Sequence, residues 1–596
     1  MSMQLQSSTS SSAPAVGGFP PAGSYATALE LEQALGSPFD PASTVSFEAA
    51  VRADEEEAPP SGAFRALEGV GAYESLVPVT EGGRLGSFDD LLMFARLLAR
   101  RDLVLTVGIG STFLAALPIW LWGDAKQRSR VAGIVMNAGF GTLGVSEKAA
   151  GSDLLATGTR ATRLDAGFRL DGEKWLVGNA RRAAFYVVLA QSEPSFGLFL
   201  VDPESVDRGT LEKLPKVRTV GLRGHDLSGV AFHGCVVPAD AAVGRVGRGL
   251  EMVATTLQFT RSLVASMCLG AGDTAMRIAL VWARERRLYG APIVELAPVR
   301  RLLVGAFADL LVSECVAISA ARGLNGAPHR MSLWSAVAKY VVPSLCEQAV
   351  RDCAEVLSAR NYLREGIASG AFQKLVRDVS ITTVFEGTEL VQLETVRAQL
   401  AYGLRRPFRR TDPAVSRSSL FAAGSPVPPW DPQARRPALS YGCDDEIVDG
   451  LDDVLDELDS PDVGERTALV GLTRRVREQR DRTRRDLASL ATGGSGRAME
   501  GYDVARKHCL VHAAACCLHM WLENRERLSR DAAAGHWLVI CLTRLLARLE
   551  EHPGEPADSA EEHCARWLQR LHDESRLFSL LELPLAPAPP GSGGDL

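Results

Sequence analysis

The amino-acid sequence predicts an α+β protein in which two helical regions flank a β domain and a further helical domain ends the chain. Two observations support this. Apolar residues recur with a helical period at about 63–140 and again at about 250–404, as in Leu91, Leu92 and Leu98. Between 141 and 243 the pattern changes to short alternating runs such as FYVVLAQ and FGLFLVD, bounded by turn residues and typical of antiparallel strands.

Segments rich in Pro, Gly and Ser mark the expected domain boundaries. The chain begins with a Ser-rich and Pro-rich stretch, contains SPVPPWDP near its middle and ends in PLAPAPPGSGG. The predicted segments are a disordered extension (1–60), an N-terminal helical domain (61–140), a middle β domain (141–243), a helical bundle (244–404), a linker (405–437), an extra helical domain (438–585) and a disordered tail (586–596).

Charge and cysteine usage exclude several classes of protein. Of 596 residues, 46% are hydrophobic and 23% charged, which excludes disorder across the whole chain. A net charge of −7 argues against a nucleic-acid-binding protein, which needs basic residues to neutralise phosphates. Eleven cysteines without CxxC spacing, and a start without a secretory signal, predict a cytoplasmic location. The uncharged stretch at 103–123 is expected to form a buried helix pair rather than a membrane span.

Three separated segments have motif character. The first is GVSEKAAGSDLLA (144–156), where the domain boundary is expected; by itself it could be a Gly/Ser loop with an Asx turn. The second is ARERRLYGAPI (283–293), which could be a solvated basic helix end. The third is LVRDVSITTVFEGTELVQLETVRAQL (375–400), in which Glu386 could simply be an acid at a helix N-terminus.

In this order the segments resemble the acyl-CoA dehydrogenase family over roughly Phe64 to Leu404. The remaining C-terminal region looks like the extra helical domain of the longer members. The resemblance implies the family fold: an N-terminal helical domain, a middle β domain and a C-terminal four-helix bundle. It also implies an oxidoreductase with FAD as cofactor.

The resemblance assigns roles residue by residue. Glu386, in "EGT", is the implied catalytic base, and the chemistry agrees because removal of a proton α to a thioester carbonyl requires a buried carboxylate of raised pKa. The implied cofactor-binding residues are Leu143, Val145, Ser146, Gly151, Ser152, Gly178, Arg286, Tyr289, Glu355, Ala359 and Thr388. The implied substrate-binding residues are Ser152, Arg261 and Gly387.

Several positions depart from the family pattern. The usual "WIT" is replaced by Leu176, Val177 and Gly178, and the usual "QxxGGxGY" by EVLSARNY (355–362). A usual Gln is replaced by Ala297, and an acidic neighbour of Arg261 by Gln258. With hydrogen bonds missing near the flavin, we expect weakened FAD binding.

The resemblance implies α,β-dehydrogenation of an acyl thioester, carried by CoA or by an acyl-carrier protein, in fatty acid or polyketide metabolism. Electrons would pass to an electron-transfer flavoprotein or to oxygen. Arg286 would reach the flavin pyrophosphate of a neighbouring subunit, which implies a homodimer or a dimer of dimers. Two alternatives stay open: a non-redox enzyme on the same fold that uses Glu386 as base, and a flavin-free binding partner.

Four residues near the end of the chain have metal-ligand character. His508, His512, Cys516 and His519 share one helical face. A helix rises about 12 Å between residues 508 and 516, so one helix can offer only an i, i+4 pair to a single metal ion. We therefore interpret these residues as core packing and expect no metal site.

Overall fold

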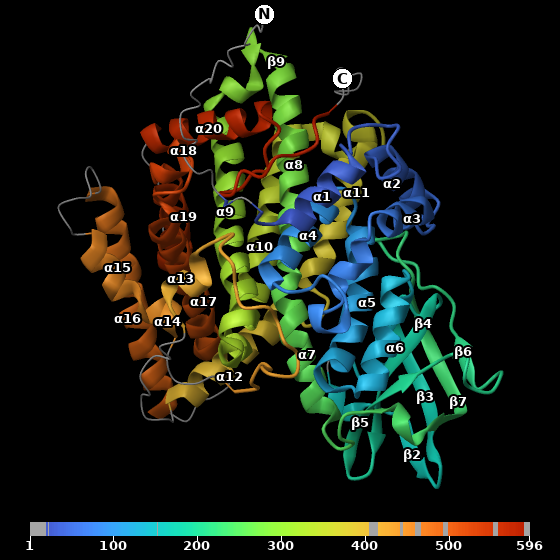
Figure 1. Cartoon of the computed structure of the whole chain (residues 1–596). Coiled ribbons are helices and arrows are strands. Elements are labelled where there is room, and N and C mark those ends of the chain that lie inside the picture. The colour runs from blue at the N-terminus through green and yellow to red at the C-terminus, as the bar shows by residue number, and fades with distance from the viewer. Residues whose placement is uncertain are drawn as a thin grey trace, which may run out of the picture.

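The computed structural model describes residues 20–21, 23–151, 153–404, 415–440, 445–458, 467–492, 499–551 and 558–588. Long helices form the centre of the molecule (Figure 1). The β sheet lies on one side of them, at the lower right of the view, and the late helices α15–α19 lie on the other.

Six helices precede the sheet: α1 Ala26–Leu35, α2 Phe47–Glu55, α3 Ser61–Gly69, α4 Phe88–Ala99, α5 Leu103–Trp122 and α6 Ala125–Met136. Side chains cap several of them, among them Ser46, Ser87 and Asp102, each of which accepts a backbone N–H of the first helical turn. The prediction that residues 1–60 are disordered is wrong for 26–55. There, α1 packs on α4 and α2 on α11, with Leu31 and Phe47 buried.

The apolar stretch after residue 103 forms the single helix α5 rather than a helix pair. Among the described residues, three helical segments are long and apolar enough to cross a membrane: Leu103–Trp122, Gly249–Glu285 and Ala297–Gly326. Their most apolar windows are 78%, 94% and 94% buried inside the protein, so packing against neighbouring helices accounts for their composition.

An eight-stranded mixed sheet follows: β1 Phe140–Gly144, β2 Arg160–Leu164, β3 Gly167–Gly178, β4 Ala183–Ser192, β5 Ser195–Val201, β6 Leu211–Lys213, β7 Leu227–Pro238 and β8 Ala242–Val243. The strand order is β6-β7-β3-β2-β4-β5-β8, and β1 pairs with β4. Most pairs are antiparallel, as predicted, but β1 and β2 are each parallel to β4. One face covers its own apolar cluster, which includes Phe168, Tyr186 and Phe199.

The central helices are α7 Gly249–Leu263, α8 Ala265–Glu285, α9 Ala297–Gly326, α10 Met331–Leu357, α11 Ala371–Val379 and α12 Glu389–Leu404; a hairpin of β9 Arg287–Leu288 and β10 Ala291–Pro292 joins α8 to α9. Helix α10 contacts α7, α8, α9 and α12 and is thus the centre of the bundle. Lys339 and Val342 of α10 are buried. Residues that lie on α10 are therefore held from several sides.

Eight further helices end the described chain: α13 Arg417–Phe421, α14 Glu446–Asp449, α15 Leu451–Leu458, α16 Thr467–Thr492, α17 Met499–Asn524, α18 Arg530–Ala533, α19 His536–Glu550 and α20 Asp558–Asp573. Helices α17, α19 and α20 pack on α9. Part of the predicted linker, 405–414, lies outside the described residues. The rest packs on the core: the Trp430 side chain is buried, and the backbone N–H of Trp430 donates to Gly86 O at 2.7 Å.

The segment after α20 inserts into the core through a buried ion pair. Arg96 of α4 and Glu314 of α9 are 2.6 Å apart and fully buried. Arg96 also donates to Phe578 O at 3.0 Å, and Glu314 accepts from Leu580 N at 2.8 Å. Ala586 N donates to Glu32 at 3.0 Å, so the first residues of the predicted tail are also anchored; residues 589–596 lie outside the description.

Glu314→Gln should therefore destabilise the whole protein. The substitution leaves the Arg96 guanidinium buried without its counter-charge, which costs about 3–5 kcal/mol. Denaturant unfolding followed by tryptophan fluorescence checks this. Glu48→Gln, which breaks the exposed Glu48–Arg52 pair, is the matched control and should leave the unfolding midpoint unchanged. Equal midpoints for the two variants would contradict the role given to Glu314.

Candidate active site

Glu386 occupies a strained turn between two helices. The chain leaves α11 at Val379, passes through a 3-10 turn at Ser380–Thr383 and enters α12 at Glu389. Between these elements Glu386 has φ 58° and Gly387 φ 101°, both in the left-handed region. A non-glycine residue in this conformation is costly and is kept only where its surroundings fix it. The turn directs the Glu386 side chain inward.

The Glu386 carboxyl is poised to accept a proton. Its Oε2 is buried and has no hydrogen-bond partner among the described residues. Burial raises the pKa of Glu386, and the nearby Thr260 hydroxyl, Lys339 and Arg261 offset only part of that increase. Burial also lowers the pKa of Lys339 to about 8, although Glu386 opposes this shift. A carboxylate with a raised pKa and an unpaired oxygen can act as a general base.

Two side chains hold the backbone of the turn. Arg261, at the end of α7, donates from Nε to Glu386 O at 3.3 Å. Gln392 of α12 donates to Gly387 O at 3.1 Å and to Glu386 O at 3.4 Å. The φ of 101° favours glycine at 387, and a Cβ there would lie 2.7 Å from Gln392 Nε2 and would push that side chain away from the turn. The Glu386 N–H donates to none of the described residues.

The signature segment after β1 is fixed by a buried ion pair. Lys174 Nζ of β3 lies 2.7 Å from Glu147 and also donates to Val145 O at 3.2 Å. The Glu147 carboxylate further accepts from Gly158 N at 2.6 Å and Thr159 N at 3.0 Å. This pinning leaves the Ser146 hydroxyl exposed on the rim of the β domain.

The other predicted residues of this segment are less informative. Leu143 is buried in β1, Val145 is half-buried and Gly151 is exposed with φ 56°. Ser152, predicted to bind both cofactor and substrate, lies outside the described residues. Thr388 is exposed just before α12.

Gly178 is enclosed by side chains from distant parts of the chain. A Cβ there would lie 2.6 Å from Ser111 Oγ of α5 and 2.9 Å from His225 Nε2. His225 is buried, its Nδ1 has no hydrogen-bond partner among the described residues, and burial lowers its pKa to about 3. Leu176 forms a β-bulge against β7, with φ 56°. The replacement of "WIT" is therefore a local repacking, and a threonine would not fit at 178.

Four predicted cofactor residues lie at the other end of the bundle. Helix α8 has 21 residues and spans about 30 Å, with Arg261 just before its start and Arg286 and Tyr289 just after its end. Tyr289 is 95% exposed, and Glu355 and Ala359 are exposed near the end of α10. The side chain of Trp282 lies between Arg286 and Arg360, at 6.0 and 5.2 Å from their guanidinium carbons. One chain does not bring this group to Glu386.

Two domain families match the chain over the sheet and the central helices. "Acyl-CoA dehydrogenase, middle domain" matches residues 142–235, and "Acyl-CoA dehydrogenase, C-terminal domain" matches residues 247–401. These two segments are therefore similar to the middle and C-terminal domains of the acyl-CoA dehydrogenase family. A relative from Geobacter metallireducens, cyclohex-1-ene-1-carbonyl-CoA dehydrogenase, is 27% identical over 358 residues, which cover 59% of this chain and 93% of that protein.

Solved structures of acyl-CoA dehydrogenases and related enzymes share the fold of this chain. An acyl-CoA dehydrogenase complexed with FAD from Bacillus anthracis has a TM-score of 0.68 at 15% identity and covers 88% of this chain and 92% of that one. A prolyl acyl carrier protein oxidase has a TM-score of 0.55 at 18% identity and covers 58% and 92%. These identities establish the fold alone. The extent of the first match indicates that the fold includes much of the C-terminal helical region.

Sequence reasoning missed four residues that the dehydrogenase fold places around the turn or the sheet edge: Thr260, Lys339, His225 and Gln392. Gln392 was visible, because it stands in the third motif six residues after Glu386. The others come from α7, α10 and a loop before β7, and no local pattern marks them. Gln258 stands where the family pattern has an acidic neighbour of Arg261. In the structure it donates to Ala438 O at 2.9 Å and so binds the segment that follows the bundle.

The residues present fit a flavin at the sheet edge. A pinned loop leaves Ser146 and nearby backbone accessible, and Glu386 keeps one buried carboxylate oxygen without a hydrogen-bond partner among the described residues. At position 178 the fit differs from the family pattern, because residue 178 itself has no side-chain hydroxyl and the neighbouring polar groups are Ser111 Oγ and His225 Nε2. Ser111 and His225 fill the space beside Gly178, so the absence of the family's threonine does not leave a void there.

Restoring the family residue at this position should therefore harm the protein. Gly178→Thr forces a side chain onto Ser111 and His225, and overpacking of this kind costs about 1–3 kcal/mol. Thermal unfolding with and without FAD measures the effect. Gly110→Ala is the matched control, since a Cβ at that exposed α5 position meets nothing within 4 Å and alanine favours helix. If Gly178→Thr is as stable as the wild type, the crowding does not exist.

Proposed function

We propose that this chain is an FAD-dependent oxidoreductase that dehydrogenates an acyl thioester at its α and β carbons to give the 2-enoyl thioester. The supporting observation is the Glu386 turn: a left-handed backbone, a buried unpaired carboxylate oxygen and a raised pKa in a single residue. The Geobacter relative, named for an acyl-CoA dehydrogenation, supports the substrate class.

In the proposed reaction the Glu386 carboxylate removes the α-proton of the thioester as the α,β double bond forms. The Glu386 N–H, which donates to none of the described residues, can donate to the thioester oxygen and stabilise the charge that develops there. Arg261 and Gln392 keep both groups in place by holding the backbone carbonyls of the turn. Lys339 and Arg261 favour the ionised base, so that part of the Glu386 population is ready to act.

FAD, when bound, supplies the acceptor for the hydride that leaves the β carbon. Residues of this chain that would hold it are Ser146, through its hydroxyl, and the backbone near Gly151, with Gly178 and His225 lining the edge. Arg286 and the loop at 355–362 lie too far along the bundle to reach the same cofactor within one chain. We therefore infer that a second copy supplies them, so that the working unit is at least a homodimer.

The proposed carrier is CoA or an acyl-carrier protein, and the proposed electron acceptor is an electron-transfer flavoprotein or oxygen, as the resemblance implies. CoA and an acyl-carrier protein both present a thioester, and one structural neighbour of this fold is named as an oxidase of a prolyl acyl carrier protein. Another structural neighbour is named for an electron transferring flavoprotein, which supports a flavoprotein of this kind as the electron acceptor. The ten described cysteines are free and buried, which suits the proposed cytoplasmic location.

Glu386→Gln should retain fold and flavin and reduce turnover by at least two orders of magnitude, because the amide keeps the volume of the side chain and cannot accept the proton. Stopped-flow bleaching of the flavin by acyl-CoA measures this step. In the wild type the rate should fall as pH drops through the raised pKa of Glu386, above the usual value of about 4.3.

Glu389→Gln is the control, since this half-buried glutamate is three residues away at the start of α12. It should bleach at nearly the wild-type rate. A Glu386→Gln variant as fast as Glu389→Gln would show that another group is the base.

The repacked wall at Gly178 favours one rival, a non-redox enzyme that uses the same base for elimination, isomerisation or decarboxylation. The two readings predict different absorption spectra. The protein purified with FAD should show flavin bands near one flavin per chain, which substrate bleaches. Absence of those bands after incubation with FAD would overturn the redox proposal and leave the non-redox enzyme or a flavin-free binding partner.

A further inference from the structure

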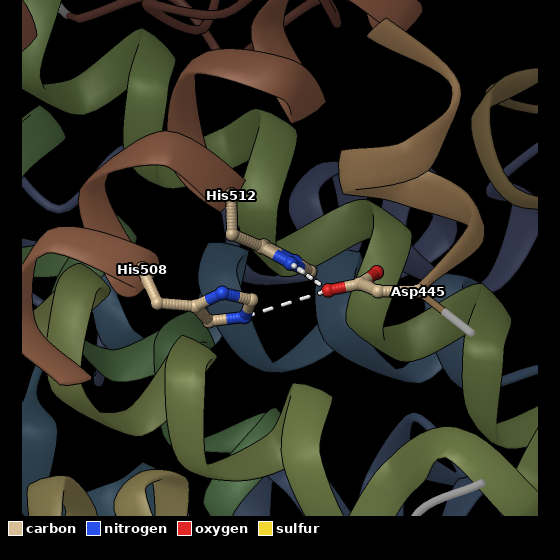
Figure 2. A group of neighbouring side chains, drawn as sticks. All are labelled: Asp445, His508 and His512. Carbon is tan, nitrogen blue, oxygen red and sulfur yellow. Dashed lines mark ion pairs between the residues drawn. The ribbon is translucent and has the colours of Figure 1, made fainter. Parts of the chain in front are cut away.

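Three buried side chains of the C-terminal region converge on one point. Asp445 stands immediately before α14, and His508 and His512 lie one turn apart on α17. Figure 2 shows the Asp445 carboxylate facing both imidazole rings. Ligands on one helix alone predict core packing at this point. The third ligand, Asp445, comes from the segment that follows the linker.

The spacing of the three atoms suits a shared cation. Asp445 Oδ2 lies 3.5 Å from His508 Nε2 and 3.5 Å from His512 Nδ1, and all three atoms lie within 4.8 Å of one another. Direct hydrogen bonds between such groups are normally shorter, about 2.7–3.2 Å. Ligands about 2.0–2.2 Å from a tetrahedral metal ion lie about 3.3–3.6 Å from each other.

Within the described part of the chain, the three atoms form only long ion pairs with one another, at 3.5 Å. Asp445 Oδ2, His508 Nε2 and His512 Nδ1 are all buried and have no hydrogen-bond partner among the described residues. The residues are 6%, 9% and 2% exposed, so bulk water does not compensate. Buried polar atoms without partners are rare and costly. A single cation placed between them would satisfy all three at once.

The surroundings orient the carboxylate for this role. Trp334 Nε1 of α10 donates to Asp445 Oδ1 at 3.1 Å, which leaves Oδ2 to face the histidines. The Asp445 N–H is held by Asp449 Oδ2 at 3.0 Å, and Arg330 pairs with the adjacent Glu446. Outer contacts of this kind are typical of metal ligands, whose orientation they fix.

We propose that Asp445, His508 and His512 bind a divalent transition-metal ion of the zinc class. Two imidazole nitrogens and one carboxylate oxygen suit Zn²⁺ or a related ion, whereas Mg²⁺ and Ca²⁺ prefer oxygen ligands alone. Three protein ligands leave a fourth position for water or another small ligand. The ion ties the start of α14 to α17 and, through Trp334, to the central bundle.

The test uses the purified full chain after treatment with a chelator and removal of that chelator. Zn²⁺ titration against a chromophoric competitor should give one ion per chain, and Co²⁺ should give the visible absorption bands of a four-coordinate site. Added Zn²⁺ should raise the thermal unfolding temperature, since it binds the folded form. Asp445→Asn and His508→Ala should abolish these responses.

Trp334→Phe should keep the ligands and weaken Zn²⁺ binding by about 10–100-fold, because it removes only the hydrogen bond that orients Asp445. His519→Gln is the matched control. His519 is buried on the same helix but bonds Ile447 O at 2.9 Å, outside the cluster, so binding should be unchanged.

Two results would overturn the proposal. If the folded wild-type chain takes up neither Zn²⁺ nor Co²⁺, the cluster is an ion pair of a carboxylate and protonated histidines. If it takes up an ion that Asp445→Asn and His508→Ala retain, the ion lies elsewhere. Should the ligand variants fail to fold, the wild-type Co²⁺ spectrum and the Trp334→Phe affinity decide the question.

Discussion

The lysine at position 374 holds three parts of the molecule at one buried point. Its Nζ lies 2.6 Å from Asp102, the cap of α5, and 2.5 Å from Asp378, one turn further along α11. Burial lowers the pKa of Lys374, but the two carboxylates outweigh it, so the pKa is raised and the ammonium is kept. Asp378 also accepts from Leu222 N at 2.5 Å, in the loop before β7. The N-terminal helices, the sheet and the bundle therefore share one ionic joint, in which removal of Lys374 would leave two buried carboxylates without their common counter-charge.

This joint fixes the chain a few residues before the candidate base. From Asp378 the backbone passes through a turn whose Thr382 carbonyl accepts a hydrogen bond from Lys339 of the central helix α10. Glu386 follows at once, in a left-handed conformation that its neighbours must impose. Because the chain is held on both sides of the turn, the strained backbone gives the Glu386 carboxyl group one fixed direction. Electrostatics and position are thus linked, because Lys339 also moderates the pKa of Glu386.

The sequence contains the parts of this arrangement that depend on local patterns. Helical periods, alternating strands and the run from Arg377 to Gln392 are contiguous features, so they predict the family fold and the candidate base. Contacts between distant segments leave no such trace. The short helices α1 and α2 lie in a Ser-rich and Pro-rich stretch, and they are stable because of packing on α4 and α11. Asp445 meets His508 and His512 only after the linker has folded back.

Position 178 shows why a motif read residue by residue can mislead. Taken alone, glycine there looks like a lost hydrogen bond to the flavin. In the folded chain the His225 ring lies close to the place where a larger side chain at position 178 would begin. Arg182 and Lys216 add to the burial that keeps this imidazole neutral, so it can either donate or accept a hydrogen bond. In this chain the polar group beside position 178 comes from the loop before β7 and not from strand β3. Any account of cofactor binding in this protein must therefore treat Gly178, Ser111 and His225 as one unit.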